Sequence, residues 1–90
     1  MSQRTVTIAS SVGLHARPAA LFVAAATATG LPVQISKLGG EPVDARSILG
    51  VMALGAKCGE EVLLTADGDG ADAALEELVA LLLRDLDAQE

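Results

Sequence analysis

Proline and glycine constrain the fold of this chain more than any other feature of its sequence, because they mark where a helix can begin and where it must end. A helix accepts proline only in its first turn, where the missing N–H is not needed. Pro18 therefore fixes the start of a helix at about residue 16, at the head of the apolar run Ala16–Thr29. Gly30 ends this helix and Pro32 prevents its continuation. The prediction places His15 at the N-cap or beside it.

Four segments are expected to form strands. Apolar and polar residues alternate over Arg4–Ala9 and over Pro32–Lys37, which is typical of strands that bury one face. Gly39–Gly40 signals a tight turn. The segment 41–44 follows it and is expected to be a short strand or edge segment, because it contains Pro42. A further strand is centred on Val62–Ala66.

Two more helices complete the predicted fold. Ser47 is expected to cap a short helix that Gly55 ends. A longer helix begins near Ala71, where leucine and valine recur at helical spacing, at positions 75, 78, 79, 82 and 86. The resulting order is β-α-β-β-α-β-α. It predicts an α+β fold of one domain, residues 1–90, with helices covering one face of a four-stranded sheet.

Charge and composition exclude several classes of function. The chain has a net charge of −6, one Phe and no Trp or Tyr. It therefore lacks the excess of basic residues that neutralises phosphates and the aromatic residues that stack on bases, and we expect no nucleic-acid binding. No apolar run reaches the roughly 18–20 residues of a membrane span, and no basic, apolar leader begins the chain. We therefore expect a cytoplasmic protein without membrane insertion.

The positive charge is concentrated in the half of the chain that holds the histidine. Residues 1–57 carry five basic and two acidic side chains, whereas residues 58–90 carry one basic and ten acidic ones. This distribution suits an anion handled near His15, although a solvated surface would give the same count.

The sequence offers little metal or disulfide chemistry. The single cysteine, Cys58, cannot form an internal disulfide, and one cysteine with one histidine cannot make a structural zinc site. We expect Cys58 to be a small buried apolar residue, and we expect no metal or cofactor.

The stretch Gly13–Ala20, GLHARPAA, places the only histidine at the expected helix start. The first N–H groups of a helix lack intrahelical partners and bind anions, and the helix dipole adds about half a positive charge there. This end disfavours the imidazolium form, so a ring nitrogen of His15 is available as a nucleophile, including towards phosphorus. Arg17 would fork onto phosphate oxygens, so Ala16, Arg17 and Pro18 form a candidate anion cradle. Taken singly, a surface histidine, a solvated arginine and a helix-starting proline would give the same residues.

Two stretches resemble the signatures of a known family. GLHARPAA is similar to the active-site stretch, and SILGVMALG (Ser47–Gly55) to the second signature, of HPr, the histidine-containing phosphocarriers of the bacterial phosphoenolpyruvate:sugar phosphotransferase system. The many Ala, Gly, Val and Leu residues of the chain suggest a GC-rich, actinobacterial-type source. The resemblance itself covers essentially the whole chain. It implies an open-faced β-sandwich, an antiparallel sheet with three helices on one face.

The resemblance also implies a role for the site residues. His15 would accept a phosphoryl group at Nδ1, and Arg17 would stabilise the phosphate. Phosphorylated Enzyme I would be the donor, and the A components of the sugar permeases (Enzyme II) would be the acceptors.

A docking surface is implied for the short helix, through Ile48, Leu49 and Met52. Five apolar residues in so short a helix are too many for one buried stripe, and an exposed apolar patch marks a partner site; the alternative is that all five belong to the core. In some relatives the serine matching Ser47 is phosphorylated in catabolite regulation, which would add charge beside this patch. A plain N-cap serine explains Ser47 equally well. Arg46 and Leu49 stand where many relatives have lysine and methionine.

The leading hypothesis is a monomeric phosphoryl carrier that is not itself an enzyme and meets its partners through a modest contact surface. Two alternatives belong to other classes. A regulatory binding module would signal through Ser47, with a serine kinase and transcriptional regulators as partners, but the intact GLHARPAA stretch argues against this as the sole role. A small hydrolase would use His15 as a base, but only Ser10 and Ser11 stand near it as nucleophiles.

Overall fold

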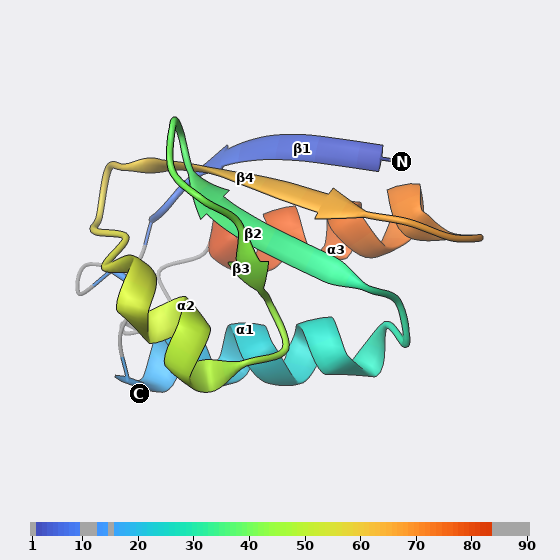
Figure 1. The fold of residues 1–90 in the computed structure, drawn as a ribbon, viewed down its shortest axis with the longest axis horizontal. Helices are drawn as coiled ribbons and strands as arrows, with labels where there is room; N and C mark the ends of the chain where they lie inside the picture. Colours follow the sequence, from blue (N-terminus) through green and yellow to red (C-terminus); the bar gives the residue numbers. More distant parts are fainter. Residues whose placement is uncertain (1, 10–12, 15, 84–90) are drawn as a thin grey trace.

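The computed structural model describes residues 2–9, 13–14 and 16–83 (Figure 1). Along the chain it forms β1 (Ser2–Thr7), α1 (Ala16–Ala28), β2 (Val33–Lys37), β3 (Val43–Asp44), α2 (Ile48–Leu54), β4 (Glu61–Ala66) and α3 (Ala71–Leu82). The predicted order of elements is confirmed. Leu86, expected in the last helix, lies outside the described residues.

All four strands belong to one antiparallel sheet, in the order β1-β4-β2-β3. Val62 and Leu64 of β4 are buried, and so are the residues opposite them, Val6 on β1 and Ile35 on β2. This face of the sheet therefore looks into the core. The two-residue strand β3 lies at the edge, as Pro42 predicted.

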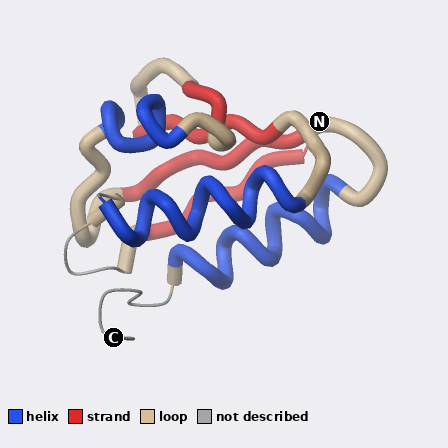
Figure 2. Tube along the Cα trace, turned by 90° about the horizontal axis from the view of Figure 1, so that it is seen from below, coloured by secondary structure: helices blue, strands red, loops and turns tan. Residues whose placement is uncertain are grey.

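The three helices lie on the same face of the sheet, and among the described residues no helix covers the other face (Figures 1 and 2). Helices α1 and α3 run side by side, and α2 lies beside the start of α1 (Figure 2). This is the open-faced β-sandwich that was expected.

The helices supply the second half of the core. On α3, Leu75, Leu78 and Leu82 recur on one face and are buried, which confirms the helical spacing read from the sequence. On α1, Phe22 is fully buried. Apart from this one aromatic ring, the core consists of the aliphatic residues that the composition predicted.

The first strand begins and ends two residues earlier than predicted. Its pairing with β4 runs from Ser2 to Thr7 rather than over Arg4–Ala9. Ala9 leaves the sheet because its N–H donates to the carbonyl oxygen of Leu82, at the end of α3, at 3.2 Å. An alternating pattern cannot show such a long-range bond. No helix within the described residues is long and apolar enough to cross a membrane.

The expectation that Cys58 is buried is wrong, because its side chain is exposed. Cys58 lies between α2 and β4, where the chain reverses at the surface and Gly59 adopts a φ of +89°. Its Sγ lies 3.9 Å from the carbonyl oxygen of Ala9. Within residues 2–9, 13–14 and 16–83 no three His, Cys, Asp or Glu side chains gather in a way that could hold a metal ion.

Candidate functional site

The predicted phosphoacceptor, His15, lies outside the described residues, but both of its neighbours are placed. Leu14 is buried, and its N–H donates to the carbonyl oxygen of Ala56 at 2.8 Å. Ala16 is the first residue of α1. The backbone on each side of the histidine is therefore fixed by the core and by the helix.

Ala16 has an unusual backbone conformation, with a φ of +45°. A residue with a Cβ pays about 1–2 kcal/mol to adopt a left-handed conformation. The buried Leu14 before it and the buried Pro18 and Ala19 after it leave the chain little freedom to relax. Such strain is held where the surrounding structure imposes it, and it is concentrated at functional sites.

Gly13 allows a close approach between the segment before α1 and the segment after α2. Its φ is +72°, and a Cβ added there would fall on the carbonyl oxygen of Ala56 and lie 2.9 Å from the Cα of Lys57. Only glycine fits both the conformation and the space. The sequence reading did not single out this requirement, although Gly13 opens the signature stretch.

The first turn of α1 brings together the three residues expected to form an anion cradle, Ala16, Arg17 and Pro18. Pro18 is buried and Arg17 is exposed. The turn contains no acidic residue, so no carboxylate of α1 offsets the positive end of the helix dipole. This geometry can bind an anion.

Helix α2 exposes part of its apolar surface, as the sequence predicted. Leu49 is 79% exposed and Ile48 is 37% exposed, whereas Val51 is fully buried. The alternative that all five apolar residues belong to the core is therefore wrong. Met52 is only partly buried and packs against the core.

The exposed apolar residue Leu21, near the docking residues of α2, was not identified from the sequence. It lies on α1, which contacts α2, and it is 40% exposed. Its position one helical turn after Arg17 puts the two residues on one face of the helix, and this i, i+4 spacing was the signal that could have found it.

Ser47 is the N-cap of α2, as predicted, and its Oγ accepts a hydrogen bond from the N–H of Gly50 at 3.2 Å. Arg46 beside it is tied to Asp44, with Nε 3.1 Å from Oδ1 and Nη2 3.3 Å from Oδ2. The side-chain hydrogen bond from Arg46 lowers the pKa of Asp44, and the backbone N–H of Arg46 lowers it further. Hydrogen bonds among residues 44–50 therefore stabilise the start of α2.

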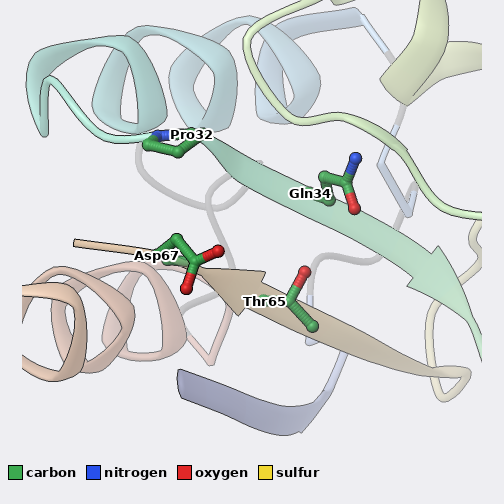
Figure 3. A pocket seen from close by; sticks show the side chains of 5 residues that line it. Pro32, Gln34, Thr65 and Asp67 are labelled. Atoms are coloured by element: carbon green, nitrogen blue, oxygen red, sulfur yellow. The ribbon is translucent and has the colours of Figure 1, made fainter. Parts of the chain in front are cut away.

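A hollow of about 170 Å³ lies elsewhere, between the start of β2 and the end of β4, lined by Pro32, Gln34, Thr65, Ala66 and Asp67 (Figure 3). Gln34 and Thr65 are partners on neighbouring strands. Pro32 follows the end of α1, and the 13 residues of that helix span about 18 Å. The hollow is thus at the opposite end of α1 from Arg17.

Comparisons with known proteins agree with this geometry. A family model described as "PTS HPr component phosphorylation site" matches residues 2–83. The phosphocarrier protein HPr of Streptomyces coelicolor is 53% identical over 97% of this chain and 94% of its own length. The HPr-like protein Crh of Bacillus subtilis is 44% identical over 89% of this chain and 93% of its own.

The same relationship holds in three dimensions. The crystal structure of a phosphocarrier protein HPr from Bacillus anthracis str. Ames aligns with a TM-score of 0.85 at 40% identity, over 90% of this chain and 95% of that chain. The chain therefore belongs to the HPr family, the phosphocarrier proteins of the phosphotransferase system, which are substrates of other enzymes and not enzymes themselves.

Proposed function

We propose that the chain takes a phosphoryl group on His15 from phosphorylated Enzyme I and passes it to the A component of a sugar permease. The observation that carries the proposal is the start of α1 directly after His15, with Arg17 in a first turn that contains no acid. The family match over residues 2–83 supports it.

The chemistry needs a nucleophile and a place for charge. The lone pair of Nδ1 forms the nitrogen–phosphorus bond while the bond between phosphorus and the donor breaks, and the second transfer reverses these roles. The N–H groups at the start of α1 and the guanidinium of Arg17 would hold the phosphoryl oxygens. Pro18 supplies no N–H and instead fixes the turn. No metal or cofactor takes part in this scheme.

Docking uses the exposed apolar residues of α2, Ile48 and Leu49, with Met52 beside them and Leu21 on α1. Side chains of this size, exposed on a small protein, fit a modest and transient contact. The carrier acts as a cytoplasmic monomer of one domain, residues 1–90, and does not bind nucleic acid.

A second, regulatory role is favoured by the position of Ser47, which caps α2 next to the exposed Ile48 and Leu49. A phosphate on Ser47 would meet the free N–H groups of the helix start and would add about two negative charges beside the docking residues. A serine kinase and transcriptional regulators would then be partners. Replacement of Ser47 by Asp should slow phosphoryl transfer from Enzyme I, and an unchanged rate would remove the regulatory role.

The test of the carrier role is intact-mass spectrometry at alkaline pH after incubation with phosphoenolpyruvate and Enzyme I. The wild type should gain one acid-labile phosphoryl group, and His15→Ala should gain none. A folded wild-type protein that gains no adduct, while Enzyme I phosphorylates a known relative, would overturn the proposal.

A further inference from the structure

The connection from α2 to β4 ends in a four-residue turn, Lys57–Glu60, which lies against both ends of the segment that leads to His15. At the first end, the N–H of Ile8 donates to the carbonyl oxygen of Glu60, and the N–H of Gly59 donates to the carbonyl oxygen of Ile8, each at 2.9 Å. At the second end, Gly13 packs against Lys57, and the N–H of Leu14 donates to the carbonyl oxygen of Ala56, the residue just before the turn.

The side chain of Glu60 holds this turn in shape. Its Oε1 accepts a hydrogen bond from the backbone N–H of Lys57 at 2.8 Å, and the N–H of Glu60 donates to the carbonyl oxygen of Lys57 at 2.9 Å. Its Oε2 lies 3.5 Å from Nζ of Lys37, at the end of β2. One carboxylate therefore closes the turn and ties it to the sheet.

These contacts connect Glu60 to Gly13 in two steps. Glu60 fixes the backbone of Lys57, and the Cα of Lys57 lies where a Cβ on Gly13 would be 2.9 Å away. A shift of Lys57 would change this contact, and Gly13 is two residues before His15. Small displacements of a reacting group cost large factors in rate.

We propose that Glu60 is a positioning residue for phosphoryl transfer, acting through the Lys57–Glu60 turn on the segment that carries His15. This inference rests on the proposed role of His15 as the phosphoacceptor. The hydrogen bond to the N–H of Lys57 does the positioning, and the contact with Lys37 supports it. The hydrogen bond from the N–H of Lys57 and the positive charge of Lys37 also lower the pKa of Glu60, in keeping with a charged carboxylate at neutral pH.

The test compares two substitutions of equal length. Glu60→Met keeps the aliphatic stem but has no good acceptor for the N–H of Lys57, and Glu60→Gln restores an acceptor without the charge. Phosphorylation by Enzyme I, followed as a time course by intact mass, should slow about fivefold in Glu60→Met, as the loss of one hydrogen bond suggests. The rate should return to within about twofold of wild type in Glu60→Gln. Glu61→Met, which removes the adjacent exposed carboxylate on β4, should leave the rate unchanged.

A spectroscopic readout separates positioning from general destabilisation. The ring-proton NMR signals of His15 should move in Glu60→Met and return in Glu60→Gln, at a temperature where both variants are folded. Equal rates and unchanged signals in Glu60→Met would overturn the proposal while leaving the carrier role intact. Failure of the wild type to be phosphorylated would instead overturn the carrier role.

A measurement on the wild type does not depend on the folding of any variant. The amide proton of Lys57 should be protected from exchange with solvent, because it is bonded to Glu60. Rapid exchange at this amide would show that the bond is not held in solution and would also overturn the positioning role.

Discussion

Replacement of Gly13 by Ala tests whether the site is held by the close approach of two backbone segments. For alanine at a φ of +72°, the left-handed conformation costs about 1–2 kcal/mol. Its Cβ would also fall on the backbone of Ala56 and Lys57, and forcing extra atoms into a packed region costs typically about 1–3 kcal/mol. Both costs lower the free energy of unfolding.

Gly30 provides a matched control, because its φ is +71° and no atom lies within 4 Å of the position of an added Cβ. Gly30→Ala should therefore lose only the stability that the left-handed conformation costs an alanine. Both substitutions reduce the entropy of the unfolded chain by a similar amount, so this effect cancels in the comparison.

The assay is urea unfolding of both variants beside the wild type, with the slopes compared as well as the midpoints. Gly13→Ala should lose about 1–3 kcal/mol more than Gly30→Ala, the part that overpacking contributes. It should also accept phosphoryl groups more slowly at temperatures where it is folded. Equal losses in the two variants would refute the close approach that is described for Gly13.

Three further outcomes are expected. Ala16→Gly removes the strain at φ +45° and should leave stability unchanged or raise it by up to about 1 kcal/mol. Ala20→Gly, at an exposed position on the same helix, should lower stability by about 1 kcal/mol. A loss of stability in both variants would contradict the strain at Ala16. Leu49→Asp should change the free energy of unfolding by less than about 0.5 kcal/mol yet slow transfer from Enzyme I, because Leu49 is 79% exposed. Val51→Ala, at a fully buried position, should instead lower stability by about 1–3 kcal/mol. The docking role of Leu49 is refuted if Leu49→Asp accepts the phosphoryl group at the wild-type rate. The pKa of Asp44 is lowered in the fold chiefly by a side-chain hydrogen bond from Arg46, and the pKa of Glu60 chiefly by the hydrogen bond from the backbone N–H of Lys57. The stability that each carboxylate contributes is therefore complete above its ordinary pKa, 3.8 for Asp44 and 4.5 for Glu60, and is lost as the pH falls below that value. Acid unfolding should therefore lower the stability of the wild type more steeply below about pH 4.5 than that of Glu60→Gln, and parallel curves would speak against a lowered pKa at Glu60.

Local signals in the sequence predicted the elements well. Pro18 lies in the first turn of α1 and Gly30 lies just after its last turn, so each marks a helix end through its own backbone. Ser47 caps α2 through a hydrogen bond to a residue three positions away. The burial of Leu75 and Leu78 follows from spacing within one helix. Each of these features depends on neighbours in the chain, which the sequence shows directly.

Features that depend on distant segments could not be predicted. The end of β1 is set by a bond between Ala9 and Leu82, and the need for glycine at position 13 is set by Ala56 and Lys57. Cys58 was expected to be buried because cysteines usually are, but a turn that must reverse at the surface overrides that preference. The role proposed for Glu60 likewise requires the fold, since nothing in the sequence brings it near Gly13.

The bond between Leu14 and Ala56 has a mechanical consequence. Gly55 is the only residue between the end of α2 and Ala56, whose carbonyl oxygen holds the residue before His15. A partner bound to Ile48 and Leu49 would thus contact a helix that is linked, through Ala56 and Leu14, to the residue that reacts. The angle at which the partner docks would then set the line along which phosphorus travels, so recognition and alignment would be a single event.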